Sequence, residues 1–125
     1  MAIVSRIAVL ARENLQNGLA DYLGHAGLQI VASAGIEAPE GEEMACVPLS
    51  LPYRAAVQLW GRARVAEAML ILGAFMPTVG MIHALEAAIR APVVSSAQAM
   101  MWQGLRLAGV PASEVVGFGR LFETG

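Results

Sequence analysis

The chain alternates between short, unbroken apolar runs and longer segments in which apolar residues recur every three or four positions. Short apolar runs bounded by Gly, Pro or polar residues are typical of strands that are buried on both faces. Segments with the longer period are typical of helices with one buried face. The pattern therefore predicts strands at 6–11, 28–34, 68–72 and 92–95, and helices at 13–27, 52–65, 78–90 and 97–108.

Strands that alternate with helices at this spacing predict an α/β fold with a parallel sheet. Right-handed crossovers place four such strands in the order 2-1-3-4, in a flavodoxin-like, three-layer arrangement. We expect residues 1–110 to form this single lobe and residues 111–125 to form a C-terminal tail. The tail needs a surface, on its own lobe or on a partner, to cover its apolar residues: Phe118, Leu121 and Phe122.

The period of the helices also predicts which of their side chains are buried. In the 13–27 helix the predicted stripe is Leu15, Leu19, Tyr22, Leu23 and Ala26, and in the 52–65 helix it is Ala56, Leu59 and Trp60. Gly27 is placed to end the first of these helices, because glycine tolerates the left-handed conformation found there.

Hydroxyl residues stand just before two of the predicted helices. Thr78 precedes the 78–90 pattern and Ser96 precedes the 97–108 pattern, where a hydroxyl can accept a bond from an unpaired backbone N–H. Both positions follow the carboxyl end of a strand, which is the edge where open α/β sheets bind ligands. Two interpretations stay open here: the hydroxyls bind a ligand, or they only cap helices.

The composition limits the classes of function. The chain is 57% hydrophobic and 14% charged, which excludes disorder, suits a sheet covered by helices and favours a buried contact between copies. Its net charge of −2 favours neither nucleic acid nor an anionic membrane. All eight basic residues are Arg, which excludes a Schiff-base lysine. With neither a signal-peptide pattern nor a membrane span in the sequence, we expect a cytoplasmic protein.

Residues 35–51 form the irregular part of the sequence and carry several glutamates together with Cys46. The glutamates lack the spacing of a calcium loop, and His25 and His83 lie far apart, so we expect a solvated acidic loop and no metal site. No sequence neighbour of Cys46 would activate its thiol, which favours an inert cysteine over a nucleophile. We also expect no cofactor.

Two motifs near the C-terminus resemble a known family. The run PVVSSAQAMMWQGLRLAG at 92–109 and GFGRLF at 117–122 resemble the Asp/Glu racemase superfamily, in its arylmalonate decarboxylase and maleate cis-trans isomerase branch. The resemblance extends back through MPTV at 76–79 and RIAVL at 6–10, and it covers the C-terminal half of a typical member.

The resemblance implies a two-lobed, cofactor-independent enzyme with its active site between the lobes. Each lobe typically supplies a cysteine or a substitute, and small carboxylates are held by backbone N–H groups and hydroxyls. The chemistry moves a proton, or carbon dioxide, next to a carboxylate, so an active member would be an isomerase, a racemase or a decarboxylase. The carbanion-like intermediate needs fixed hydrogen-bond donors.

The chain departs from the family pattern at three points. Counting back from Pro92, the family cysteine position falls on Gly73, which has no side-chain proton to give. The loop after the first strand, residues 11–14, lacks the usual Thr or Tyr, and the resemblance covers only one of the two lobes. The catalytic residues are therefore unknown, while the resemblance implies a set of substrate contacts: Gly73, Ala74, Phe75, Thr78, Ser95, Ser96 and Arg12.

Three hypotheses of function follow. In the first, the chain binds a small carboxylate, and a second copy or a separately encoded lobe completes the cleft. In the second, it is a non-catalytic assembly or regulatory domain that keeps the fold. The third, a flavin or nucleotide binder, rests on fold analogy alone, because Gly73 and Gly80 do not fit a dinucleotide-binding fingerprint.

Overall fold

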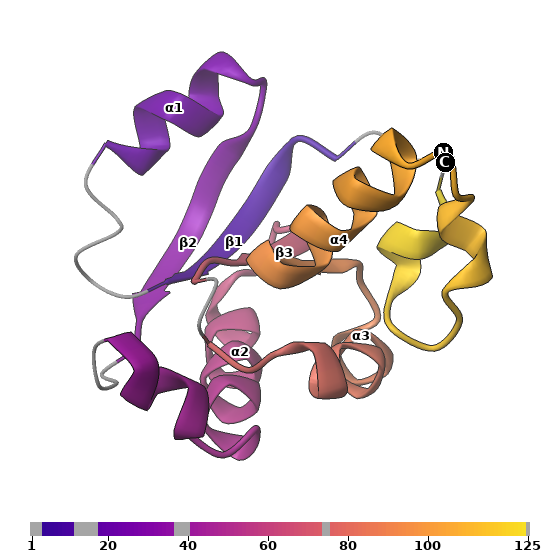
Figure 1. Ribbon diagram of the computed structural model, residues 1–125. Coiled ribbons are helices and arrows are strands. Elements are labelled where there is room, and N and C mark those ends of the chain that lie inside the picture. Colours follow the sequence, from indigo (N-terminus) through magenta and orange to yellow (C-terminus); the bar gives the residue numbers. More distant parts are fainter. Residues whose placement is uncertain (1–3, 12–17, 37–40, 74–75, 125) are drawn as a thin grey trace.

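The computed structural model describes residues 4–11, 18–36, 41–73 and 76–124. Within these residues four strands alternate with four α-helices, and short 3-10 helices lie between them and in the tail (Figure 1). In chain order the elements are β1 (Arg6–Ala11), α1 (Leu19–His25), β2 (Gln29–Gly35), η2 (Gly41–Cys46), α2 (Ser50–Arg62), β3 (Ala68–Ile71), η3 (Val79–Met81), α3 (Ile82–Ile89), β4 (Val93–Ser95), α4 (Ser96–Leu107), η4 (Ala112–Glu114) and η5 (Arg120–Glu123).

The strands form one parallel sheet in the order β2-β1-β3-β4, which confirms the predicted topology. Val9 of β1 lies opposite Leu70 of β3, and Leu70 lies opposite Val94 of β4. β1 and β3 are the inner strands, and five of the six residues of β1 are buried. A strand covered on both faces has no polar side, which explains the unbroken apolar runs in the sequence.

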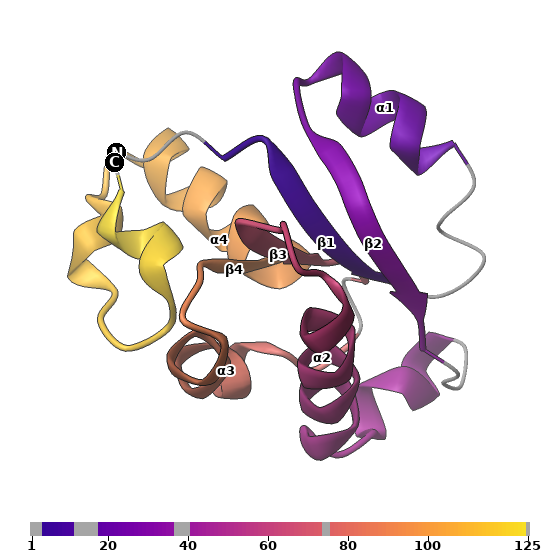
Figure 2. The same ribbon diagram turned by 180° about the vertical axis from the view of Figure 1, so that it is seen from behind.

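Helices cover both faces of the sheet, as the three-layer prediction requires. α2 and α3 lie on one face, and α1 and α4 lie on the other (Figures 1 and 2). Alternate side chains of β1 point to opposite faces of the sheet and belong to two separate hydrophobic cores. Ala8 and Leu10 pack with α2 and α3, whereas Ile7 and Val9 pack with Leu23 of α1.

The first helix differs from its prediction in length and in buried face. Within the described residues α1 begins after Gly18 and ends at His25; residues 12–17 lie outside the described part. Leu23 is buried as predicted, but Tyr22 is 74% exposed, because so short a helix on an edge strand presents only a narrow face to the sheet. Gly27 has the predicted left-handed conformation, φ 86°, just after the helix end.

The other predicted buried stripe is confirmed, and the 78–90 helix is divided. Ala56 and Leu59 of α2 are fully buried, and Trp60 packs partly buried against the same core. The 78–90 segment begins as the 3-10 helix η3 and continues as α3. It ends at Arg90, which takes the left-handed conformation with φ 58° and donates its N–H to the Glu86 carbonyl.

The C-terminal tail folds back on its own lobe. η5 lies beside α4 and near α3 (Figure 1), and Phe122 is 3% exposed. Trp102 Nε1 of α4 donates to the Thr124 carbonyl at 2.8 Å. Phe118 remains 43% exposed, so whether it covers a partner stays a prediction.

None of the helices in the described part of the chain combines the length and the apolar character needed to cross a lipid bilayer.

Candidate functional site

The predicted site lies where β1, β3 and β4 end. Leu72 N donates to the Leu10 carbonyl at 2.9 Å, which extends the pairing of β1 and β3 to the start of the loop. The chain then turns at Gly73, whose φ is 135°, and the Gly73 carbonyl accepts from Met76 N at 3.2 Å. This conformation favours glycine. The turn therefore explains a glycine at this position on backbone grounds alone.

Ser96 approaches this turn from the start of α4. Its Oγ accepts a hydrogen bond from the Gly73 N–H at 3.1 Å, and both residues are half-buried. A hydroxyl that accepts one bond still has its own O–H to donate. The contact brings together two of the predicted site residues, 23 positions apart in the chain.

The prediction that Ser96 caps the helix was wrong, because the cap is Ser95. Ser95 Oγ accepts from Gln98 N at 3.3 Å, and Gln98 Oε1 accepts from Ser95 N at 2.8 Å. This reciprocal pair is a capping box. Because Ser95 caps the helix, the Ser96 hydroxyl is free to accept the hydrogen bond from Gly73.

Thr78 stands before η3, as predicted, but its side chain makes no capping bond. The residue is 2% exposed, and its Oγ1 has no hydrogen-bond partner among the described residues. A buried hydroxyl without a partner loses its bonds to water and gains none in return. The structure therefore corrects the capping role of Thr78 and leaves a buried polar atom in need of a partner.

Four further residues named from the sequence are Arg12, Ala74, Phe75 and Cys46. Arg12, Ala74 and Phe75 lie outside the described residues. Cys46 ends η2 and is exposed. Its segment follows β2, which β1 separates from β3 in the sheet.

Two buried polar residues, Gln98 of α4 and Glu86 of α3, were missed by the sequence analysis. Gln98 is 1% exposed, and its Nε2 donates to the Phe118 carbonyl of the tail at 2.7 Å. Glu86 is 5% exposed. For Gln98 a signal existed, since Ser-x-x-Gln at 95–98 is a capping-box pattern.

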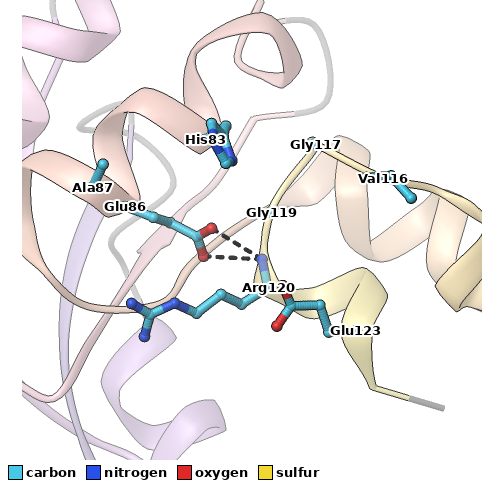
Figure 3. A pocket seen from close by; sticks show the side chains of 8 residues that line it. All are labelled: His83, Glu86, Ala87, Val116, Gly117, Gly119, Arg120 and Glu123. Carbon is cyan, nitrogen blue, oxygen red and sulfur yellow. Dashed lines mark hydrogen bonds between the residues drawn. The ribbon is translucent and has the colours of Figure 1, made fainter.

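A hollow of about 320 Å³ opens between α3 and the tail, away from the predicted edge. Figure 3 shows His83 and Glu86 on α3 facing Arg120 and Glu123 of the tail. The Glu86 carboxylate accepts from Arg120 N at 2.9 and 3.3 Å and from Val93 N at 2.9 Å. Both of its oxygens are thus used to fasten the backbone. Among the described residues, no three His, Cys, Asp or Glu side chains gather as a metal site.

Comparisons with known proteins identify the family. The sequence pattern of the arylmalonate decarboxylase family matches residues 2–122, so the chain belongs to that family. No curated protein sequence matches the chain. A crystal structure of arylmalonate decarboxylase is similar with a TM-score of 0.86 at 27% identity, over 98% of this chain and 54% of the other.

Two maleate isomerases share the fold at lower identity. A variant of the Pseudomonas putida S16 enzyme, solved with maleate, has a TM-score of 0.83 at 24% identity and covers 95% of this chain and 48% of its own. A mutant of the Nocardia farcinica enzyme, with a covalently bound succinylcysteine intermediate, has a TM-score of 0.79 at 23% identity and covers 98% and 50%. The chain therefore spans about half the length of the proteins it matches.

Proposed function

We propose that this member of the arylmalonate decarboxylase family binds a small carboxylic acid at the turn that follows β3. The buried, unpartnered hydroxyl of Thr78 is the observation that carries the proposal. A carboxylate oxygen would supply the missing partner, since an ionised carboxylate accepts hydrogen bonds and gives none. The O–H of Ser96, which is fixed by the Gly73 N–H, is a second donor at the same turn.

The proposal keeps the other predicted contacts. The backbone of Ala74 and Phe75 would add N–H donors, and Arg12 would neutralise the charge of the acid, for which its planar guanidinium is suited. Ser95 contributes through the capping box, because that box fixes the start of α4 from which Ser96 approaches Gly73. A direct contact between Ser95 and the acid stays a prediction.

Turnover needs an acid, a base or a thiol, and Gly73 supplies none of these at the turn. Gly73 offers a backbone N–H but no acid, base or thiol, and Cys46 follows a different strand. A cofactor-independent decarboxylation or isomerisation would require a proton donor or acceptor near the carbon next to the carboxylate. We propose that a second copy of the chain, or a separately encoded lobe, supplies that group and closes the site.

The alternative function is an assembly or regulatory domain without chemistry. It is favoured by Gly73 and by the apolar side chains that α4 exposes, among them Met100 (64%), Met101 (57%) and Leu107 (80%). Such a surface suits a contact between lobes. Under this alternative the domain associates but does not respond to small acids.

Thermal unfolding in the presence of a panel of acids separates the two functions. The panel contains malonate, maleate, aspartate, glutamate, an arylmalonate and phosphate. A ligand that binds only the folded state at 100 times its Kd adds about 2.7 kcal/mol to the free energy of unfolding, or roughly 10 °C in Tm for a domain of this size. The proposal predicts such a shift for one class of carboxylate and none for phosphate.

The matched variants for this panel are Thr78→Val and Tyr22→Phe. Thr78→Val keeps the shape and removes the buried hydroxyl, so it should fold at least as stably as the wild type but lose most of the ligand-induced shift. Tyr22→Phe removes an exposed hydroxyl on α1, which covers the opposite face of the sheet from α3, and should leave the shift unchanged. A flat response of the wild-type protein to the whole panel would refute carboxylate binding by this lobe.

A further inference from the structure

Gln98 joins the start of α4 to the C-terminal tail. Its Oε1 accepts from Ser95 N at 2.8 Å, and its Nε2 donates to the Phe118 carbonyl at 2.7 Å. The side chain is 1% exposed, so neither bond competes with bulk water. A buried amide that uses both ends in this way fixes the two backbone segments relative to each other.

Glu86 holds the same part of the tail from the opposite side. Its carboxylate accepts from Arg120 N (Figure 3). It also accepts from Val93 N, the first residue of β4. β4 is an edge strand, and the Val93 N–H is thereby paired. Residues 117–120, which we call the strap, are therefore bonded to Gln98 of α4 and to Glu86 of α3, and Glu86 also bonds the first residue of β4, the strand that ends at Ser95.

Gly119 allows the strap to lie this close. A Cβ at position 119 would overlap Gln98 Nε2 and would stand 2.9 Å from Ile82 Cγ2. The φ of 114° also favours glycine. Gly117 has a comparable φ of 88°, but a Cβ there would meet nothing within 4 Å. Of these two positions, only 119 needs both the conformation and the absence of a side chain.

From these contacts we propose that the strap, acting through Gln98, positions the Ser96 hydroxyl against the Gly73 N–H, and that Gln98 is a positioning residue for the carboxylate site. The path runs from the Phe118 carbonyl through Gln98 to Ser95, and from the adjacent Ser96 to Gly73. The role of Gln98 in carboxylate binding rests on the proposed function. The other part of the proposal, that the strap stabilises the hydrogen bond between Ser96 and the Gly73 N–H, can be tested without any ligand.

The test is the amide exchange rate of Gly73, measured by NMR without ligand. The Gly73 N–H donates to Ser96 and to no atom of Gln98 or of the strap, so a change in its exchange rate reports positioning. Gly119→Ala should raise the rate about tenfold, the effect of weakening one ordinary hydrogen bond. Gly117→Ala, which carries similar backbone strain without the overlap, should leave the rate near that of the wild type.

A second pair of variants covers the case in which Gly119→Ala does not fold. Gln98→Met keeps the length of the side chain and removes both bonds, and it should raise the Gly73 rate by a similar factor. Trp102→Phe removes the bond between Trp102 and Thr124, a tie between the same helix and the same tail, and it should not. Equal Gly73 rates in the test and control variants would overturn the proposal.

Measuring the Kd of a bound acid separates the failure of this inference from the failure of the proposed function. If an acid of the panel binds the wild type, Gln98→Met should weaken its Kd about tenfold, while Trp102→Phe should leave Kd unchanged and lower only the Tm. If no acid binds the wild type, the proposed function fails, and the exchange rates still decide whether the strap controls Gly73. An unchanged Kd in Gln98→Met would refute the positioning role of Gln98.

Discussion

Gly73 shows how a single residue links the backbone to the proposed chemistry. Its φ of 135° is unfavourable for any residue with a Cβ, but among the described residues a Cβ there would meet only Met76 atoms, at the ordinary distances of 3.5 and 3.7 Å. We therefore expect Gly73→Ala to fold, with a free energy of unfolding lower by about 1–3 kcal/mol from backbone strain. Urea denaturation measures this difference.

The control for that substitution is Gly61→Ala. Gly61 lies inside α2, and a Cβ there would meet nothing within 4 Å. Because alanine forms helices better than glycine, we expect this variant to be more stable by about 0.5–1 kcal/mol. A Gly73→Ala protein as stable as Gly61→Ala would mean that position 73 is not strained.

Glu67 predicts a dependence of stability on pH. Its carboxylate accepts from the backbone N–H groups of Arg6 and Ser5 and from the Arg6 side chain, and these bonds hold its pKa below the usual 4.5. A pKa that is lower in the folded state stabilises the fold above the ordinary pKa and loses that contribution as pH falls through the folded value. The free energy of unfolding should therefore decline as pH is lowered below 4.5.

Chemical denaturation at a series of pH values measures this contribution. The Glu67→Gln variant lacks the titrating group, so its stability should fall less steeply below pH 4.5 than that of the wild type. Parallel curves for the two proteins would show that the bonds of Glu67 do not contribute.

At the scale of the element, the start of α4 gives a prediction that distinguishes two neighbouring serines. Ser95→Ala breaks the capping box and should lower the free energy of unfolding by about 1 kcal/mol. Ser96→Ala removes the partner of the Gly73 N–H without touching the cap, so it should cost less stability but should reduce carboxylate binding. Denaturation and ligand titration of both variants check the two roles; the reverse pattern would contradict them.

The strands and their order could be predicted from the sequence, whereas the helix ends could not. Burial on both faces leaves strands such as β1 without any polar position, which makes an apolar run visible in the sequence. Helix ends depend on local hydrogen bonds that compete closely. Both Ser95 and Ser96 can cap a helix, and the choice between them depends on whether Gln98 returns a bond.

The polar part of the site was less predictable than the fold. The two sequence motifs at 76–79 and 92–109 predicted Thr78, Ser95 and Ser96 as site residues. They could not show that Thr78 is left without a partner or that Ser96 bonds Gly73. Glu86 lies among the buried residues Ile82, Leu85 and Ile89 of α3, and its partners come from β4 and the tail. Contacts between segments far apart in sequence have no local signal.

At the scale of the whole molecule, the described lobe corresponds to about half of the proteins it matches. A cleft between two lobes would bring a second set of residues to the Gly73 turn, and the exposed apolar residues of α4 are available for a contact between lobes. Light scattering across a range of protein concentrations, with and without the binding acid, would show whether a second copy fills this role. A monomer under all conditions would favour a separate partner lobe.

The most direct test of carboxylate binding at the β3 turn is a titration of the isotope-labelled protein with maleate and malonate, followed by ¹H–¹⁵N NMR. The account predicts saturable shifts that centre on the amides of Gly73, Thr78 and Ser96, and that are lost in Thr78→Val. Shifts that centre instead on His83 and Arg120, which line the hollow beside the tail, or no saturable shifts at all, would contradict it.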